Sequence, residues 1–327
     1  MGKIDPKKIS GARKAAMPDF VPPQLATLVQ DPPSGSEWFH ELKFDGYRML
    51  CHLNRGKAQF WSRNGKDWTE KFSGLTPALK RLPLVSAILD GEVVVVDPKG
   101  RSSFQRLQQS MGSGGGAFIY QIFDLIYLDG YNLQRTPLRE RKAVLEKLLT
   151  VETKGQLRYS DHIEGSGEAF LKQACEFGIE GIVSKMADSP YDSTRNRNWQ
   201  KIKCSKRQEF VIAGYTPSKK GFPGFGSLIL GVYEKGKLTY TGRVGTGFSI
   251  KQRLELQKKL DRIAQDKTPF VVKPKDPGLR DAQWARPEMI AEVEFTEWTS
   301  DNIIRHPSFK GLREDKKPKQ VVREEPA

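Results

Sequence analysis

Short strand-like runs that end at turn residues recur along most of this chain of 327 residues. Residues 46–62 predict a hairpin that turns at Asn54-Arg55-Gly56. Residues 88–96 are rich in β-branched side chains and predict a strand that stops at Asp97-Pro98. Further strands are expected at 118–128, 181–185 and 199–203. These runs make β-sheets the main element of the expected fold.

Two predicted helices and a glycine-rich loop interrupt the strands. Thr136 is expected to cap a helix at 137–149, which has proline at its first position. A second helix is expected at 168–177, where Gly178 ends it. The stretch 110–116 is expected to be a glycine-rich loop.

The pattern of predicted elements changes after about Ser205. The capping-box pattern Ser249-x-x-Gln252 predicts the start of a helix. The elements expected in this part are four strands and that helix, at 210–215, 227–234, 237–244, 290–298 and 250–263. Several short strands with one helix favour a small OB-type barrel. We therefore expect a loose N-terminal arm or linker at 1–20, a first domain at 21–205 and an OB-fold domain at 206–327.

The charge of the chain points to a polyanionic partner. Lys and Arg number 54 against 39 Asp and Glu, a formal net charge of +15, which favours nucleic acid or an anionic membrane. Residues 201–250 hold nine Lys or Arg but only two acids, and the loop at 218–226 mixes cations with aromatic side chains. This mixture, without a dominant basic amphipathic helix, favours nucleic acid over membrane. A solvated, solubilising surface is the alternative interpretation.

Segments that would target or cross-link the chain are not evident in the sequence. No apolar run reaches transmembrane length, and the N-terminus lacks the apolar core of a signal peptide, so we expect a cytoplasmic protein. Cys51, Cys175 and Cys204 are far apart and include no C-x-x-C pair. This spacing argues against both a disulfide framework and a zinc site.

Lys43 is the strongest candidate for a reactive group. It lies between the apolar lead-in 38–42 and a strand-like run at 47–53. A lysine with apolar neighbours is expected to be partly desolvated, which lowers the pKa of its ammonium toward the free amine. Lysine is one of the few side chains that form covalent intermediates once activated in this way.

Other charged residues suggest what electrophile such a lysine would meet. Lys201 and Lys203 alternate along a predicted strand, so both ammonium groups face one side. Two cations on one face suit a triphosphate and would depress the pKa of a neighbouring lysine. An exposed strand face with solvated lysines is the alternative.

Carboxylates offer candidate metal or ribose contacts. Asp90 and Glu92 share one strand face and could bind a metal or accept hydrogen bonds from ribose hydroxyls; the alternative is a bulge at Asp90-Gly91 with Glu92 in solvent. Glu180 precedes a short predicted strand, where it could hold Mg²⁺ together with substrate phosphates. Phe123, inside a predicted buried strand, is by composition a core residue.

The order of these residues is more specific than any one of them. The segments are Lys43-x-Asp45-Gly46-x-Arg48, Ser62-Arg63-Asn64-Gly65, Asp90-Gly91-Glu92, Phe123 to Gly130, Glu180-Gly181-Ile182-Val183-x-Lys185, Lys201-x-Lys203 and Leu312-Arg313-Glu314-Asp315-Lys316. This series resembles the successive motifs of the covalent nucleotidyltransferases, which include ATP-dependent DNA ligases, RNA ligases and mRNA capping enzymes. The resemblance implies an α+β fold: a nucleotidyltransferase domain, ATP-grasp-like, with antiparallel sheets and flanking helices, followed by an OB-fold β-barrel.

A narrower resemblance is carried by residues 17–28, 41–48 and 62–69. They are similar to the ligase domain of bacterial ligase D, the sealing enzyme of non-homologous end joining. That family's large members also carry polymerase and phosphoesterase domains, and this sequence has neither, so a stand-alone ligase and an excised domain both remain open. The implied activity is ATP-dependent sealing of nicks that carry a 5′-phosphate and a 3′-hydroxyl, in double-strand break repair.

The resemblance also assigns roles to residues. Lys43 would attack the α-phosphate of ATP and become Lys-AMP, while Asp45 would orient the lysine and a metal. Phe123 would stack on adenine, and Glu180, with Glu92, would bind Mg²⁺ or Mn²⁺. The remaining nucleotide contacts would come from Glu41, Leu42, Arg48, Arg63, Glu92, Lys201 and Lys203. The last motif would close over the leaving pyrophosphate through Arg313, Asp315 and Lys316.

The implied reaction cycle also sets expectations for motion and partners. The OB domain would swing between pyrophosphate and DNA about a hinge near residues 204–206. Expected partners are nicked or broken duplex DNA, a Ku-type end-binding protein and a separate polymerase or phosphoesterase, with a monomeric ligase and no membrane. An RNA-joining or capping-type nucleotidyltransferase is the alternative enzyme. A non-catalytic nucleic-acid-binding protein on a ligase scaffold is the alternative outside enzymes.

Overall fold

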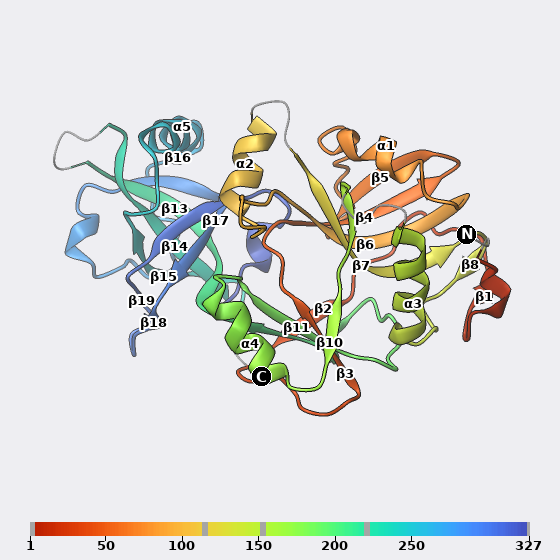
Figure 1. The fold of residues 1–327 in the computed structure, drawn as a ribbon. Coiled ribbons are helices and arrows are strands. Elements are labelled where there is room, and N and C mark those ends of the chain that lie inside the picture. The colour runs from red at the N-terminus through yellow and green to blue at the C-terminus, as the bar shows by residue number, and fades with distance from the viewer. Residues whose placement is uncertain (1–3, 113–116, 151–154, 219–222, 326–327) are drawn as a thin grey trace. The chain divides into compact units, whose positions relative to one another are not determined.

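The chain forms two compact units. The computed structural model describes residues 4–112, 117–150, 155–218 and 223–325. Unit 1 comprises Met1–Cys204 with Glu325–Ala327, and unit 2 comprises Ser205–Glu324 (Figure 1). The two units are built around separate apolar cores.

Unit 1 contains a seven-stranded sheet in the order β1-β8-β7-β6-β4-β5, with β9 beside β7. Neighbours in this sheet are antiparallel, except that β9 runs parallel to β7. Its strands are β1 (Arg13–Lys14), β4 (Tyr47–Asn54), β5 (Lys57–Ser62), β6 (Ser86–Val94), β7 (Ile119–Leu128), β8 (Tyr131–Asn132) and β9 (Leu157–Tyr159). The predicted hairpin is confirmed as β4 and β5, joined by Arg55 and Gly56, both at positive φ as a tight two-residue turn requires.

A second, five-stranded sheet of unit 1 has the order β10-β3-β11-β12-β2. Its strands are β2 (Leu25–Leu28), β3 (Trp38–Leu42), β10 (His162–Glu164), β11 (Gly181–Met186) and β12 (Arg195–Lys203). Strand β2 lies parallel to β12, and the other pairs are antiparallel. Strands far apart in the sequence, β3 and β11, become neighbours in this sheet, which matters for the site described below.

The helices of unit 1 are short, and most of them contact strands of its two sheets. They are α1 (Thr76–Leu79), α2 (Phe104–Gly112), α3 (Leu138–Leu149) and α4 (Gly167–Glu176), with 3-10 turns at Pro6–Lys8 and Ser73–Leu75. Helix α4 ends before Gly178, which has a positive φ, as predicted. The glycine-rich loop expected at 110–116 is wrong for its first three residues, because they complete the last turn of α2. Its remaining residues, 113–116, lie outside the described part.

Helix α3 begins differently from the prediction. Pro137, not Thr136, is its N-cap residue, and the Thr136 hydroxyl makes no capping hydrogen bond. The first free backbone amides of the helix instead donate to the neighbouring segment, from Leu138 to the carbonyl of Ser189 and from Arg139 to that of Ala187. Tertiary contacts thus satisfy the orphan donors that a capping side chain would otherwise take.

The N-terminal segment is a second correction. Residues 4–20 were expected to be a loose arm, but β1 pairs with β8 and the amide of Ala15 donates to the carbonyl of Gly130. Ile9 is buried in the core of the seven-stranded sheet, and Ile4 packs against it. The polar, basic composition of this segment gave no indication that its few apolar side chains would pack into the core. Residues 1–3 lie outside the described part.

The cysteines are a third correction. Cys175 and Cys204 form a disulfide, with Cα atoms 5.3 Å apart, while Cys51 is free and buried. Helix α4 carries Cys175 and packs on β11, and β11 pairs with β12, which leads to Cys204. Packing of three elements brings together two residues that sequence spacing alone did not connect.

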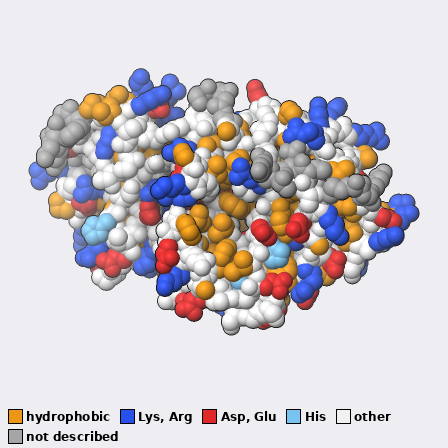
Figure 2. Space-filling model, in the orientation of Figure 1, with side chains coloured by type: hydrophobic (Ala, Val, Ile, Leu, Met, Phe, Trp, Pro, Cys, Tyr) orange, Lys and Arg blue, Asp and Glu red, His pale blue; other side chains and the backbone are white. Residues whose placement is uncertain are grey.

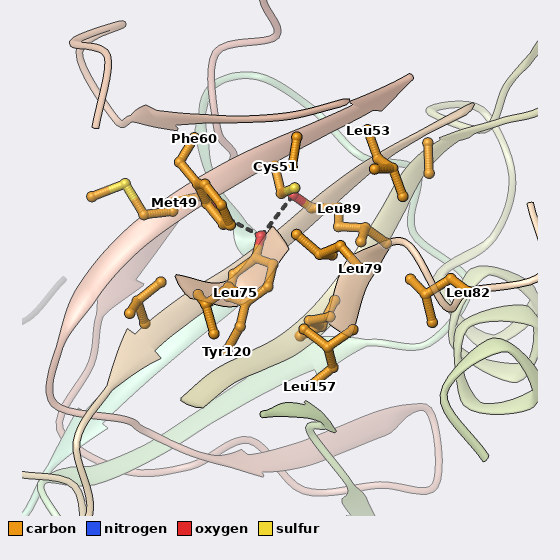
Figure 3. Close-up of a cluster of buried hydrophobic side chains, with 14 of the residues drawn as sticks. Met49, Cys51, Leu53, Phe60, Leu75, Leu79, Leu82, Leu89, Tyr120 and Leu157 are labelled. Atoms are coloured by element: carbon orange, nitrogen blue, oxygen red, sulfur yellow. Dashed lines mark hydrogen bonds between the residues drawn. The ribbon is translucent and has the colours of Figure 1, made fainter. Parts of the chain in front are cut away.

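The largest core of unit 1 lies on one face of the seven-stranded sheet. Met49, Leu89 and Tyr120 contribute to it from neighbouring strands, and helix residues such as Leu79 cover them. The buried Tyr120 hydroxyl donates 2.8 Å to the carbonyl oxygen of Met49 and 2.9 Å to that of Leu89 (Figure 3). These bonds satisfy the one polar group that a buried tyrosine brings.

Unit 2 is built on a six-stranded antiparallel sheet in the order β15-β14-β13-β17-β16, with β20 beside β17. Its elements are β13 (Lys206–Pro217), β14 (Phe225–Glu234), β15 (Lys237–Val244), α5 (Ile250–Asp261), β16 (Ala264–Gln265), a 3-10 turn (Pro277–Leu279), β17 (Gln283–Phe295), β18 (Glu297–Trp298), β19 (Ile304–Arg305), β20 (Ser308–Arg313) and a 3-10 turn (Pro318–Gln320). The predicted capping box of α5 is present, with Ser249 and Gln252 bonding reciprocally. Strands β13, β14, β15 and β17 and helix α5 were predicted, although β17 begins at Gln283 and not at residue 290. Strands β16, β19 and β20 were not predicted, and the short β18 lies at the end of the segment predicted as one strand.

Candidate active site

Lys43 and Glu180 meet because two strands of the five-stranded sheet are neighbours. Lys43 follows β3 and Glu180 precedes β11, and the antiparallel register of these strands pairs Leu42 with Ile182. The amide of Lys43 donates 2.9 Å to the carbonyl oxygen of Gly181, which holds the loop to the strand. The Lys43 Nζ then lies 2.6 Å from Glu180 Oε2.

Two glycines of this region permit close approach of backbones. A Cβ at Gly181, whose φ is 152°, would lie 2.0 Å from the carbonyl oxygen of Ile202 on β12. A Cβ at Gly46 would lie 2.2 Å from the carbonyl oxygen of Val93. Side chains at these positions would push the strands apart, so the glycines fix the spacing on both sides of Lys43.

The pKa of Lys43 is shifted opposite to the prediction. Burial acts to lower the pKa of its ammonium, as expected from its apolar neighbours. The Glu180 carboxylate, with smaller contributions from Glu92 and Asp45, outweighs that and raises the pKa above its ordinary value. Glu180 therefore favours the cationic form of the lysine, and loss of its negative charge would lower the pKa of Lys43.

Asp45 joins the lysine loop to helix α2. Its backbone amide donates 2.9 Å to the hydroxyl of Ser102. Its carboxylate Oδ2 accepts a hydrogen bond of 3.1 Å from the amide of Phe104, the first residue of α2. The side chain thus caps a helix and also contributes negative potential at Lys43.

Arg48 is fixed by a buried carboxylate. Its guanidinium donates to both oxygens of Asp90, at 3.0 Å and 2.6 Å, and to the carbonyl of Gln24 at 2.6 Å. The hydroxyl of Tyr191 donates to the same carboxylate at 2.7 Å. Asp90 is fully buried, so it serves as an anchor for Arg48 and not as the metal or ribose ligand considered from the sequence.

Phe123 lies at the edge of a small aromatic group. It is only partly buried, and its ring centroid is 5.2 Å from the Arg48 guanidinium and 6.0 Å from the ring of Trp199. Lys185 Nζ is 4.4 Å from the same centroid. Phe123 comes from the seven-stranded sheet, whereas Trp199 and Lys185 come from the five-stranded sheet. The two sheets of unit 1 therefore face each other here.

The remaining candidates of unit 1 lie on elements of the same two sheets. Lys201 and Lys203 are partly exposed on β12, where they pair with Val183 and Gly181 of β11. Arg63 follows β5, and Glu92 on β6 lies opposite Arg48 on β4. The candidate residues that the sequence showed only as an ordered series of motifs therefore lie on two facing sheets.

Residues of the last motif belong to unit 2 and form an ion network there. Arg313 donates to both oxygens of Asp315, at 2.9 Å and 2.8 Å, and lies 3.2 Å from Glu292. Lys316 pairs with Glu209. These carboxylates raise the pKa of Arg313 even though burial acts to lower it.

The positive charge of the basic segment 201–250 is partly neutralised by acids that lie outside the segment. Arg207 pairs with Glu292, and Arg243 pairs with Asp276, acids contributed by later elements of unit 2. Figure 2 shows Lys and Arg side chains spread over the visible surface rather than gathered in one patch. The part of the predicted cation and aromatic loop at 219–222 lies outside the described residues.

Sequence reasoning missed the surroundings of Glu41. Its carboxylate is buried on β3 and receives Lys142 Nζ at 2.7 Å, Lys185 Nζ at 2.9 Å and the Ser160 hydroxyl at 2.9 Å. Burial acts to raise the pKa of Glu41, but Lys142 and Lys185 together lower it. Helical periodicity could have indicated this contact, because Lys142 lies on the apolar face of α3.

A divalent cation fits the donors near Lys43. No group of three or more His, Cys, Asp or Glu side chains with metal-binding geometry occurs within the described ranges. Mg²⁺ usually takes only one or two protein carboxylates and completes its shell with water and substrate phosphates. Glu180 and Glu92, whose carboxylates both raise the pKa of Lys43, would supply that number.

Two family models match the chain. One, described as ATP dependent DNA ligase domain, matches residues 23–203, and the other, described as ATP dependent DNA ligase C terminal region, matches residues 222–316. The multifunctional non-homologous end joining protein LigD of Pseudomonas aeruginosa is 41% identical over 318 residues, which cover 96% of this chain and 38% of that protein. The chain therefore spans about two fifths of the length of this curated relative.

A solved structure agrees with these sequence matches. Mycobacterial DNA ligase D complexed with ATP and MES has a TM-score of 0.71 and 34% identity, covering 93% of this chain and 98% of that one. This likeness identifies a nucleotidyltransferase fold followed by an OB-fold domain, as predicted. Within the described residues, no helix is long and apolar enough to cross a membrane. From the family models and the relatives, the chain belongs to the family of ATP-dependent DNA ligases.

Proposed function

We propose that this chain seals nicks in duplex DNA through a Lys43-AMP intermediate, using ATP. The observation that carries this proposal is the contact of 2.6 Å between Lys43 Nζ and Glu180, in a loop held by the carbonyl oxygen of Gly181. A covalent lysine nucleophile needs a neighbouring group that controls its charge, and Glu180 is in position to do so.

In the first step the neutral amine of Lys43 attacks the α-phosphorus of ATP. A phosphorus–nitrogen bond forms, the bond between the α-phosphorus and the bridging oxygen breaks, and pyrophosphate leaves. The proton that the nitrogen loses passes to the Glu180 carboxylate, 2.6 Å away. Lys201 and Lys203 neutralise charge on the α-phosphate, which is the main requirement of phosphoryl-type transfer. Arg48, anchored by Asp90, and Arg63 hold the sugar and phosphate with Glu92, and Phe123 stacks on adenine.

Glu180, with Glu92, would hold a divalent cation, Mg²⁺ or Mn²⁺. When bound, such an ion would supply charge neutralisation at the phosphates. Asp45 orients the lysine loop through its cap on α2.

The later steps transfer the adenylate to DNA. An oxygen of the 5′-phosphate attacks the Lys43-AMP phosphorus and releases the lysine, and a 3′-hydroxyl then attacks the adenylated 5′-phosphate and expels AMP. We assign the adenylation domain to unit 1 and the OB-fold domain to unit 2, so the N-terminal segment belongs to the adenylation domain. The hinge is assigned to residues 204–206. Arg313, Asp315 and Lys316 are assigned to the leaving pyrophosphate of the first step.

The relatives' printed name suggests the setting of this activity. We propose that the ligase acts in non-homologous end joining in the bacterial cytoplasm, as a monomer, with a Ku-type end-binding protein and a polymerase or phosphoesterase as partners. A basic chain that tracks the phosphate backbone holds a nick without reading its sequence.

Intact-mass measurement after exposure to ATP and a divalent cation tests the proposal. We expect one adenylate added per chain, released by pyrophosphate, and lost in Lys43→Ala. Lys147→Ala, which removes a lysine from the last turn of α3, is the matched control and is expected to retain the adduct. Absence of the adduct in the unaltered protein, or a preference for GTP, would contradict the proposal.

A further inference from the structure

A disulfide joins helix α4 to the point where the chain leaves unit 1. Cys175 lies in the last turn of α4 and Cys204 directly follows β12, with the two Cα atoms 5.3 Å apart. Unit 2 begins at the next residue, Ser205, so Cys204 is the first residue of the segment 204–206 assigned above as the hinge. The disulfide therefore fastens one end of this hinge to a helix of unit 1.

Cys204 is also tied to the candidate active site. Its backbone amide donates 3.0 Å to the carbonyl oxygen of Glu180, whose carboxylate contacts Lys43. On the other side of Glu180, the amide of Ile179 donates 2.9 Å to a carbonyl oxygen in the last turn of α4. The disulfide completes a closed ring that runs from Cys204 through Glu180 to α4. Both ends of the segment around Glu180 are therefore anchored to the same helix.

Noncovalent contacts already hold these elements together. Ala174 of α4 packs in an apolar cluster with Ile182 of β11 and Ile202 of β12. Strands β11 and β12 also pair in antiparallel register from Gly181 to Lys185. We therefore expect the reduced protein to keep its fold. Its Tm should fall by about 5–10 °C, because a cross-link between residues 29 apart in the sequence is lost.

The proposed setting and the exposure of the two cysteines favour a reversible bond. In the bacterial cytoplasm, disulfides are rare, and those that form are usually transient and catalytic or redox-sensing. Cys175 and Cys204 are both partly exposed, whereas Cys51 is free and fully buried. A small oxidant or a thiol in water can therefore reach the pair, while Cys51 is shielded from both.

We propose that Cys175 and Cys204 form a redox-sensitive switch, in which the disulfide restrains the hinge and slows nick sealing, and reduction releases it. In the disulfide form the backbone of Cys204 is anchored to α4, so Ser205 and Lys206 alone absorb the rotation of the OB-fold domain. In the dithiol form all three residues can do so. The inference rests on the proposed function, because the hinge matters only if the two domains rearrange during sealing.

A peroxide supplies the oxidation. The thiolate of one cysteine attacks an oxygen of hydrogen peroxide, the oxygen–oxygen bond breaks, and a sulfenic acid and water result. The sulfur of the other cysteine then attacks the sulfenic sulfur, a sulfur–sulfur bond forms, and the hydroxyl group leaves as water. In total the two thiols lose two electrons and two protons, and the peroxide becomes two molecules of water. A dithiol reverses the reaction through two thiol–disulfide exchanges.

Single-turnover sealing by the adenylated protein tests the switch, because this reaction starts after pyrophosphate has left and requires the OB-fold domain to move to DNA. One sample is treated with hydrogen peroxide and another with dithiothreitol, and each reagent is removed before nicked duplex DNA is added. We expect the oxidised protein to seal at least about 5-fold more slowly, the lower end of typical couplings between two sites. Alkylation of the denatured protein, read by mass, should find Cys51 as the one free thiol after oxidation and all three cysteines free after reduction.

Variants of the cysteines separate the switch from other effects of peroxide. Cys175→Ser removes the disulfide from the helix side and should seal at the rate of the reduced protein after either treatment. Cys204→Ser removes it from the hinge side and should behave in the same way. Cys51→Ala is the matched control, because it removes the cysteine outside the pair and should keep the difference between the two treatments.

The outcomes separate this inference from the proposed function. Equal sealing rates of the oxidised and reduced protein, three free thiols after peroxide, or an undiminished response to peroxide in Cys175→Ser would each overturn the switch while leaving the proposed function in place. Absence of Lys43 adenylation in both redox states would instead overturn the proposed function, and the switch with it.

Discussion

Three residues of helix α3 hold carboxylates in three different settings. Arg141 and Asp124 are both fully buried and form a balanced pair, with bonds of 2.7 Å and 2.9 Å. Lys142, the next residue, shares Glu41 with a second cation. Arg139 pairs with Asp188 at the surface, where the two side chains are 45% and 66% exposed. One helix thus carries a balanced buried pair, an unbalanced buried cluster and a solvated pair.

The comparison shows that the two buried ionic groups of α3 differ in charge balance: Arg141 and Asp124 neutralise each other, whereas Glu41 carries two cations. The Arg141 guanidinium also donates to the carbonyl oxygens of Thr136 and Ser189, so that pair fastens the start of α3 to the strands beside it. Every charge in it has a partner, as a structural ion pair requires. The group of Glu41, Lys142, Lys185 and Ser160, called the Glu41 cluster, instead keeps two buried cations on one carboxylate.

The largest effect is expected from breaking the balanced pair. Asp124→Asn keeps the shape of the side chain but leaves Arg141 as a buried cation without its anion. We expect the free energy of unfolding to fall by about 3–5 kcal/mol. Urea denaturation followed by intrinsic fluorescence measures this loss. A loss similar to that of a surface pair would mean that Arg141 is solvated when its partner is removed.

A smaller loss of stability is expected in Lys142→Met. Glu41 keeps Lys185 as a partner, so no charge is left unpaired, and the loss should correspond to a charged hydrogen bond, about 1.5–3 kcal/mol. The same denaturation experiment compares it directly with Asp124→Asn. Should Lys142→Met cost as much as Asp124→Asn, the proposed distinction between balanced and unbalanced ions would fail.

The excess charge of the Glu41 cluster predicts a pH dependence of stability. The pKa of Lys185 is lowered from 10.5 to about 8, chiefly by burial. Between these values the unfolded chain binds more protons than the folded one, so this group makes stability rise as the pH increases from about 8 to about 10.5. Lys142→Met removes the repelling cation and should reduce this rise, whereas Arg141→Lys should leave it unchanged. Thermal melts across this range, compared among the three proteins, measure the effect.

The smallest effect is expected at the surface pair. Asp188→Ala removes the partner of Arg139, and exposed ion pairs contribute about 0–1 kcal/mol because water screens both charges. The change in unfolding free energy should stay below that of either buried variant, and added salt should reduce it further. A loss as large as that of Lys142→Met would show that exposure does not govern these pairs.

Much of the fold followed from local patterns. The hairpin of β4 and β5 was predicted because Asn54-Arg55-Gly56 suits a tight turn, and the start of α5 because Ser249 and Gln252 form a capping box. The start of α3 was predicted wrongly because its amides bond to the carbonyls of Ala187 and Ser189, about 50 residues further along the chain. The disulfide between Cys175 and Cys204 was missed for the same reason.

The candidate site divides in the same way. Sequence order pointed to Lys43 and Glu180, whose side chains are in contact, and to Phe123, which lies beside Arg48. The direction of the pKa shift of Lys43 was wrong, since local sequence showed its apolar neighbours but not the carboxylate of Glu180 at 2.6 Å. Asp90 was considered as a ligand, and only its contact with Arg48 shows it to be an anchor.

By itself, the sequence determined where strands and turns occur, which residues carry the family's motifs and what nucleotide chemistry they suit, because these properties depend on residues close together in the chain. Only the tertiary structure decided the charge of Lys43, the anchoring of Arg48 and the surroundings of Glu41. Each of these depends on groups brought within about 3 Å by the pairing of distant strands and the packing of α3, and electrostatic interactions of buried groups are set by such distances.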